Sequence, residues 1–146
     1  MPSLPNVLTG LLDAQAARDP DGNALTDGRT NLTWSEYRDR AASLAGALAA
    51  VGVQPGDRVA IHLPKSVDSF VAAHAIVRLG AVMVPIDWLA PPDYVAEVIG
   101  DADVAAIVSA ADQERLAGML GASSPPRVVA PDAVAPPAPA AEVDPN

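Results

Sequence analysis

Lys65 is the residue best placed to contact an anion. It is the only lysine of the chain and lies between Leu63-Pro64, at the expected end of a strand, and Ser66, where a helix is expected to begin. The first turn of a helix favours anions through its free amide groups and its dipole. A phosphate contact by Lys65 is therefore one interpretation. The other, which we favour, is a surface lysine beside a helix cap formed by Ser66.

His62 and His74 are the candidate general bases. His62 follows the apolar residues of an expected strand, and His74 lies within an apolar stretch of an expected helix. Neither has a nucleophile or a carboxylate at a spacing that defines a catalytic pair, and Asp68 does not supply one. We therefore expect both histidines to pack in the core or at its edge.

Asp87 follows Pro85 at the end of an expected strand, where α/β proteins often place functional groups. Its other possible role is to cap the turn before Pro91-Pro92, and this structural role is the one we expect. Trp88 is an aromatic residue in the same loop. It either covers the end of the core or contacts a further part of a larger protein.

Motifs that would hold a metal or a nucleotide are missing. With no cysteine and two separated histidines, the sequence offers no cluster of the kind that binds zinc. It also lacks the Gly-x-Gly-x-x-Gly and Walker-type loops that indicate nucleotide binding. We therefore assign no catalytic, cofactor-binding or metal-binding residue, and we expect this chain alone to hold no cofactor.

The charge of the chain argues against nucleic acid as a partner. The formal net charge is -9, and a phosphate backbone needs clustered Lys and Arg. Residues 87–146 carry ten acids and two bases, which we interpret as a solvated surface. The N-terminus has no basic region followed by an apolar run, and no run of about 18 apolar residues occurs in the sequence. We therefore expect no export, no membrane insertion and a cytoplasmic protein.

The N-terminal third of the sequence predicts two helices and a hairpin. Apolar residues at helical spacing favour a helix from Asn6 to Arg18, and short strands flank a turn at Asp27-Gly28-Arg29. The residues Thr33-Trp34-Ser35-Glu36 have the form of a capping box that starts a long helix, with Gly52 as its left-handed C-cap. The apolar stripe of this helix comprises Tyr37, Ala41, Leu44, Leu48 and Val51.

From Arg58 onward, expected strands and helices alternate. The strands are Arg58–Leu63 and Ala81–Pro85, both expected to be buried, followed by Val104–Ser109 and Arg127–Val129. The helices are Ser66–Leu79, Pro91–Ile99 and Gln113–Leu120. Such alternation with short loops implies parallel pairing and helices that cover the sheet, so the predicted fold class is α/β with a mostly parallel sheet.

The chain is expected to divide near residue 122. We predict that residues 1–122 form one folded part and that residues 123–146 form a linker or tail. Seven residues of the second segment are proline, and most of the rest are alanine, valine or acidic. Because such a composition buries little apolar surface, we expect a disordered Pro/Ala-rich tail.

Three segments in order carry a family likeness. They are Leu32–Tyr37 with the helix behind it and Gly52–Ile61, then Val77–Asp87, then Val104–Ser109. Together they resemble the opening of the AMP-forming acid ligases, which include acyl-CoA synthetases, adenylation domains of non-ribosomal peptide synthetases, and luciferases. The second segment is similar to the signature L-K-A-G-x-x-Y-V-P-I-D of that superfamily. Here Arg78 and Met83 replace its lysine and tyrosine.

The resemblance implies that residues 1–122 are the first part of a large N-terminal ligase domain. In that family a carboxylic or amino acid reacts with ATP to give an acyl-adenylate and pyrophosphate, and the acyl group then passes to a thiol of CoA or of a carrier protein. ATP and Mg²⁺ are thus implied for the complete enzyme. The phosphate loop, the aromatic-Gly-x-Thr-Glu segment, the Thr-Gly-Asp and the lysine of the C-terminal domain do not occur here. Glu142–Asn146 is similar to the acidic lead before the phosphate loop.

Three hypotheses follow for what such a chain does. The first is an N-terminal part of a ligase, inactive alone, whose partner is the remainder of the enzyme in cis or in trans, with a carrier protein as a further partner. The second is a non-catalytic interaction module that docks on a ligase or a carrier protein. The third is a small independent nucleotide-binding domain. We favour the first. Two segments, Pro85-Ile86-Asp87 and Leu63-Pro64-Lys65-Ser66, slightly favour amino-acid-activating, carrier-loading members over fatty acid–CoA ligases.

Overall fold

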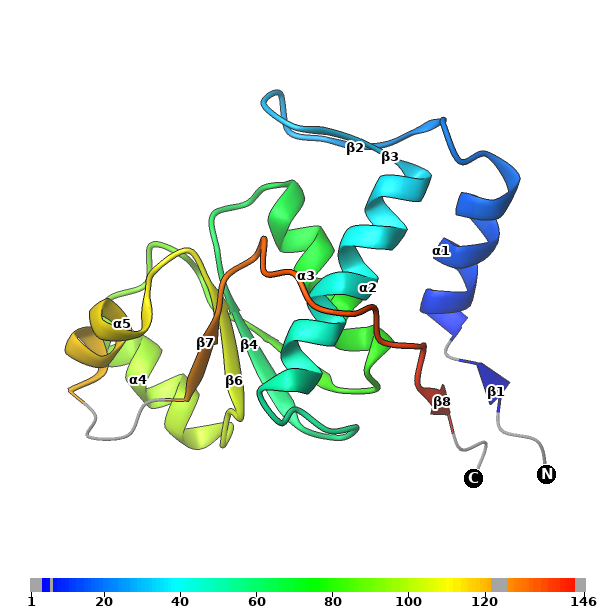
Figure 1. Cartoon of the computed structure of the whole chain (residues 1–146). Coiled ribbons are helices and arrows are strands. Elements are labelled where there is room, and N and C mark those ends of the chain that lie inside the picture. Colours follow the sequence, from blue (N-terminus) through cyan, green and yellow to red (C-terminus); the bar gives the residue numbers. More distant parts are fainter. Residues whose placement is uncertain (1–3, 6, 122–125, 144–146) are drawn as a thin grey trace.

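The computed structural model describes residues 4–5, 7–121 and 126–143. At its centre is a parallel sheet of four strands, ordered β5-β4-β6-β7. The strands are β4 (Arg58–His62), β5 (Val82–Pro85), β6 (Ala106–Ser109) and β7 (Arg127–Val129). The predicted α/β class, with helices flanking a parallel sheet, is confirmed (Figure 1).

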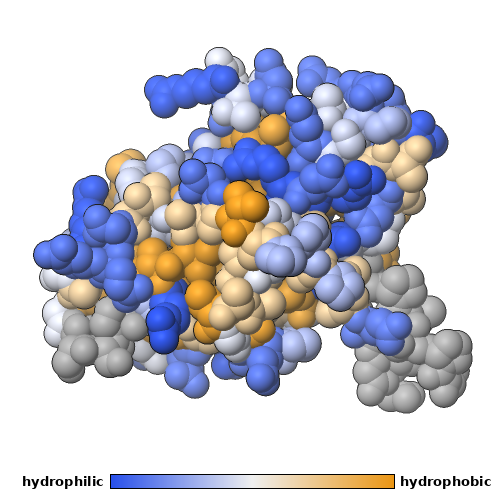
Figure 2. All heavy atoms as spheres, in the orientation of Figure 1, coloured by the Kyte–Doolittle hydropathy of each residue, from blue (hydrophilic) through white to orange (hydrophobic). Residues whose placement is uncertain are grey.

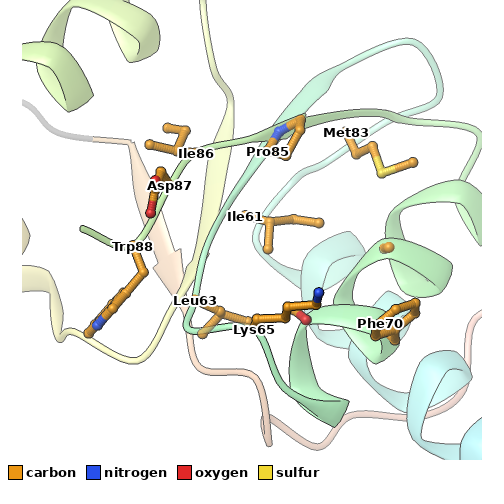
Figure 3. Close-up of a pocket in the computed structure, with 11 residues that line it drawn as sticks. Ile61, Leu63, Lys65, Phe70, Met83, Pro85, Ile86, Asp87 and Trp88 are labelled. Atoms are coloured by element: carbon orange, nitrogen blue, oxygen red, sulfur yellow. The ribbon is translucent and has the colours of Figure 1, made fainter. Parts of the chain in front are cut away.

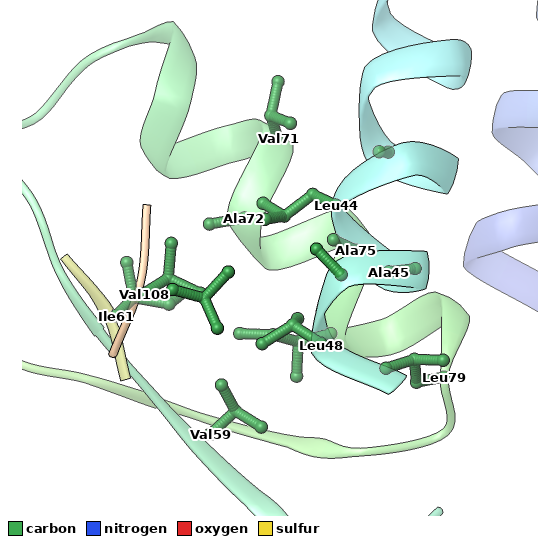
Figure 4. Close-up of a cluster of buried hydrophobic side chains, with 14 of the residues drawn as sticks. Leu44, Ala45, Leu48, Val59, Ile61, Val71, Ala72, Ala75, Leu79 and Val108 are labelled. Atoms are coloured by element: carbon green, nitrogen blue, oxygen red, sulfur yellow. The ribbon is translucent and has the colours of Figure 1, made fainter. Parts of the chain in front are cut away.

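Helices cover both faces of this sheet. One face packs against α2 (Trp34–Ala50) and α3 (Val67–Arg78), and the other against α4 (Pro92–Asp101) and α5 (Gln113–Leu120). Because side chains alternate along a strand, Val59 and Ile61 face α2 and α3, whereas Ala60 faces α4 and α5. Figure 4 shows the first of these two cores, with Leu44 and Leu48 of α2 directed toward the strands.

The N-terminal elements pack on the outer side of this core. Helix α1 (Val7–Arg18) is present, as predicted, and lies against α2, and the hairpin of β2 (Asn23–Thr26) and β3 (Asn31–Thr33) leads into α2. The expected capping box is present. The Thr33 hydroxyl accepts the Glu36 N–H at 3.2 Å, and the Glu36 carboxylate accepts the Thr33 N–H at 2.8 Å.

The stripe expected on α2 is buried except for its last member. Tyr37, Ala41, Leu44 and Leu48 lie in the core, whereas Val51 is 39% exposed. Val51 is the C-cap of the helix, and Gly52 follows it with a φ of 99°. The left-handed Gly52 ends the helix, and the next residue, Val53, is again buried in the core.

The expectation that Ala81–Pro85 is a buried strand is wrong. Strand β5 lies at the edge of the sheet and pairs only with β4 within the described residues. Val82 and Met83 are 51% and 43% exposed. No strand adjoins the outer edge of β5 in the described part of the chain. Pro85 suits this position, because proline has no N–H and is confined to edges of sheets.

The segment expected to be a linker or tail begins in the sheet, since it includes β7. Residues 133–141 then pass over α2 and α3, where Ala133, Ala135 and Ala138 pack against the core. The segment ends in β8 (Glu142–Val143), which pairs antiparallel with β1 (Leu4–Pro5). The predicted disorder is not tested here, and residues 123–125 and 144–146 lie outside the described residues.

Figure 2 shows the face of the molecule along which this segment runs. Apolar residues gather in the middle of that face, and hydrophilic residues lie over the hairpin.

Among the described helices, none has the length and apolar content that a membrane span requires.

Candidate functional site

An open apolar pocket of about 360 Å³ lies at the exposed edge of the sheet. It is bounded by β5, by the end of β4 and by the outer side of α3 (Figure 3). Its apolar walls include Ile61, Leu63, Phe70, Met83, Pro85 and Trp88. Lys65 and Phe70 lie on the α3 side of this pocket, and Asp87 and Trp88 lie at its other end. The pocket can bind apolar groups, and Lys65, Ser69 and Asp87 are its hydrophilic lining residues.

Lys65 is an exposed residue just before α3, as the sequence suggested. Ser66 is the N-cap of α3. The anion-binding position at this helix end already holds a carboxylate of the chain itself, because Asp27 in the hairpin turn accepts the Val67 N–H at 3.0 Å. Lys65 therefore lacks the free helix start that a bound phosphate would use.

Asp27 is fixed by further backbone bonds within its own turn. Its second carboxylate oxygen accepts the N–H groups of Thr30 at 2.8 Å and of Arg29 at 2.9 Å. The bonds from Val67, Thr30 and Arg29 favour the charged form and lower the pKa of Asp27 to about 2. The hairpin and α3 are thus joined by one ionised side chain.

His62 and Ser109 meet at the ends of two neighbouring strands. His62 is 2% exposed, and its Nδ1 lies 3.5 Å from the Ser109 hydroxyl oxygen. That oxygen also accepts the Ala111 N–H at 3.1 Å, and the Trp88 ring lies over His62 with a centroid distance of 4.8 Å. Burial lowers the pKa of His62, and the Arg115 guanidinium lowers it further. A neutral, enclosed histidine of this kind is a core residue, as expected.

His74 packs against Tyr37 between α2 and α3. The two rings are edge to face, with centroids 4.9 Å apart, and the Tyr37 hydroxyl is hydrogen-bonded to His74 Nδ1. Burial lowers the pKa of His74 and raises the pKa of Tyr37 above its usual value. This pair is also part of the packing, which confirms the prediction for His74.

The remaining candidates have structural partners. Asp68 accepts from Arg40 at 2.7 Å and so joins α3 to α2. Asp87 accepts the Leu89 N–H at 2.9 Å, which confirms the predicted turn cap. Trp88 is half-buried over His62 and lines the pocket as well, so it covers one end of the core.

The residues present do not fit Mg²⁺ or the phosphates of ATP. No group of three or more His, Cys, Asp or Glu is close enough to hold a metal ion in the described part of the chain. The helix start beside Lys65 is taken by Asp27.

Two residues that join distant elements of the fold are not predicted to do so from the sequence. The sequence indicates Asp27 only as a turn residue and Arg78 only as a replacement within a signature. Asp27 contacts a helix 40 positions further along the chain, and Arg78 contacts Asp13 and Ala138. The spacing of residues along the sequence gives no signal for such contacts.

A family model described as AMP-binding enzyme matches residues 12–145. Enterobactin synthase component F of Escherichia coli (strain K12) is 40% identical over 106 residues, which are 73% of this chain and 8% of that protein. Isonitrile lipopeptide synthase of Mycobacterium tuberculosis is 38% identical over 109 residues, 74% of this chain and 4% of that protein. The chain thus spans less than a tenth of the length of these relatives.

Solved structures with the same fold include parts of non-ribosomal peptide synthetases. The N-terminal subdomain of NpsA from Klebsiella oxytoca, in complex with 3-hydroxybenzoyl-AMSN, superposes with a TM-score of 0.70 at 25% identity. That match covers 85% of this chain and 30% of the other. The synthetase FmoA3 gives a TM-score of 0.78 at 26% identity, over 97% of this chain and 15% of the other.

Proposed function

Because this chain belongs to the AMP-binding enzyme family, we propose that it forms the first part of an adenylation domain in a longer ligase. The complete enzyme would activate a carboxylic or amino acid as an acyl-adenylate and pass it to a thiol. The similarity to non-ribosomal peptide synthetases supports an amino acid and a carrier-protein thiol, and the 3-hydroxybenzoyl-AMSN complex of NpsA supports an aryl acid as a further possibility. This chain alone is expected to be inactive.

The observation that carries this proposal is the uncovered apolar edge of the sheet. Val82 and Met83 on β5 are about half exposed, and Phe70 on the neighbouring side of α3 is 50% exposed. The side chains of Phe70 and Met83 line a pocket that opens to solvent. Isolated proteins rarely leave such contiguous apolar surface open, and an exposed patch of this kind is typical of an interface. We assign it to contact with the remainder of the ligase.

In this proposal the chain supplies a scaffold. The buried residues of β4 and β6 and the turn at Asp87 hold β5 and Trp88 in place. ATP and Mg²⁺ are expected to bind residues of the remainder, since the described residues do not fit them. A carrier protein as partner and a cytoplasmic location are further parts of the proposal.

A graft tests the proposal. Residues of this chain replace the matching segment of enterobactin synthase component F, and ATP–pyrophosphate exchange is measured with the acid of that enzyme. We expect exchange by the chimera and none by the 146-residue chain alone. Exchange by the chain alone would overturn the proposal.

The role of the exposed edge is tested in the same chimera. Met83→Asp places a charge in the proposed interface and is expected to reduce exchange at least about tenfold, because an unpaired charge is costly to bury. Val134→Asp is the matched control, since Val134 is 87% exposed and does not line the pocket. If both substitutions reduced ATP–pyrophosphate exchange equally, we would conclude that the exposed edge of β5 is not part of the interface. Capture of an intact ligase by the chain alone would favour the interaction module instead.

A further inference from the structure

Residues 133–141, here called the strap, make a series of backbone contacts with α2 and α3. The Ala138 N–H donates to the Ala42 carbonyl at 3.1 Å, and the Ala141 N–H donates to the Arg78 carbonyl at 2.6 Å. The Ser43 hydroxyl donates to the Ala135 carbonyl at 3.2 Å. These bonds satisfy polar groups of an extended segment that has few side chains able to do so.

Arg78 contacts the strap with its side chain as well. Its Nε donates to the Ala138 carbonyl at 2.9 Å, and its Nη1 donates to the Asp13 carboxylate at 3.0 Å. The Arg78 side chain is 12% exposed. One guanidinium therefore joins α1, α3 and the strap. The planar fork of arginine suits two acceptors at once, which a lysine ammonium on a flexible stem does not match.

Gly46 gives the strap room to approach α2. A Cβ at this position would overlap the carbonyl oxygen of Pro136. Gly46 lies within a helix, where glycine is less favourable than alanine by about 1 kcal/mol. The close backbone approach explains why a glycine occupies this position.

We propose that α2 and α3 form a seat for the strap, and that Arg78 is the positioning residue that holds it there. The strap leads directly to β8, whose pairing with β1 fixes the position of Val143. Arg78 thereby sets the place from which residues after Val143 continue. This last step rests on the proposed function, in which the chain is the first part of a longer ligase. The seat itself does not depend on that function.

Amide hydrogen exchange of the 146-residue chain, followed by NMR, tests the seat. Because three of its residues are proline, the amides from Ala135 to Ala141 belong to Ala135, Ala138, Ala140 and Ala141. We expect protection of Ala138 and Ala141 in the wild type. Arg78→Ala is expected to speed their exchange at least about tenfold, because a bond to a charged donor is lost, and Arg78→Lys is expected to have an intermediate effect.

Gly46→Ala tests the contact between α2 and the strap without changing the charge of Arg78. It should speed exchange of Ala138 while keeping α2 helical, because the added methyl group overlaps the strap and not the helix. Gly118→Ala in α5 is the matched control, since a Cβ there meets no atom within 4 Å. Exchange of Ile107 in the central strand β6 reports whether each variant is folded.

Unprotected Ala138 and Ala141 in the wild type would overturn the inference. Wild-type exchange rates in folded Arg78→Ala and Gly46→Ala would also overturn it. Because exchange is measured on the chain alone, an inactive chimera with a protected strap would count only against the proposed function.

Discussion

Asp27 determines what the start of α3 can bind. Its carboxylate takes the Val67 N–H, which otherwise could contact an anion beside Lys65. It is held in place by the amides of Arg29 and Thr30 in the same turn. An internal anion at the N-terminus of a helix stabilises that helix, since it satisfies a free amide and interacts with the helix dipole. The start of α3 therefore serves to join the hairpin to the rest of the fold through the Asp27 carboxylate.

Asp27→Asn is expected to lower the melting temperature at pH 7 by a few degrees. The folded-state pKa of Asp27 is about 2, below its ordinary value of 3.8. The contribution of its charge is therefore complete above about pH 4 and is lost as the pH falls from about 4 to about 2. Thermal melts at pH 7, 4 and 2 should show the difference from wild type shrinking over this interval.

Asp21→Asn is the control for this measurement, because Asp21 takes part in none of these bonds. A constant difference between wild type and Asp27→Asn from pH 7 to pH 2 would contradict the assignment of the effect to the Asp27 charge.

Helix α2 shows how far local sequence determines an element. Thr33 and Glu36 form both bonds of the capping box, and the helix begins at Trp34. Four residues of its apolar stripe are buried at the spacing that the sequence shows. Strand β5 is the contrary case, since its apolar residues gave the same signal as a buried strand but lie at an edge.

Thr33→Ala is expected to destabilise the protein by about 1 kcal/mol, because the Glu36 N–H loses its acceptor at the start of α2. Chemical unfolding followed by circular dichroism measures the free energy of unfolding. Thr30→Ala in the neighbouring turn is the matched control, as Thr30 bonds to Asp27 through its backbone N–H and carbonyl, which the substitution keeps. Equal effects of the two substitutions would argue against the capping role of Thr33.

The molecule as a whole is a sheet between two unequal cores. The core under α2 and α3 also receives residues of α1 and of the strap, whereas the core under α4 and α5 is smaller. Leu48 has no exposed surface and lies in the larger core (Figure 4). Because small alanine and valine side chains make up much of this core, each large side chain in it contributes many contacts.

Leu48→Ala is expected to lower the free energy of unfolding by about 2–5 kcal/mol, since it leaves a cavity that its neighbours fill only in part. Leu89→Ala removes the same atoms from a side chain that is 85% exposed, and should change stability by less than about 0.5 kcal/mol. Urea unfolding of both variants compares them directly. A small loss for Leu48→Ala would mean that this core is loosely packed.

The sequence by itself determined the elements and their class. Capping residues, glycines and apolar spacing act within a few positions, so they predicted the hairpin, the long helix and the alternation of strands and helices. The segments Leu32–Tyr37 and Val77–Asp87 also led to the family. His62 and His74 pack in the core and Asp87 caps its turn, as their neighbours in sequence predicted.

Only the tertiary structure decided which strand lies at the edge and which distant residues meet. Val82 and Met83 are exposed because no strand covers the far side of β5 in the described residues, and strand order is not encoded in one strand's composition. Asp27 reaches Val67, and Arg78 reaches Asp13 and Ala138, across 40 to 65 positions of sequence. Such contacts depend on how whole elements pack, and packing is a property of the folded chain.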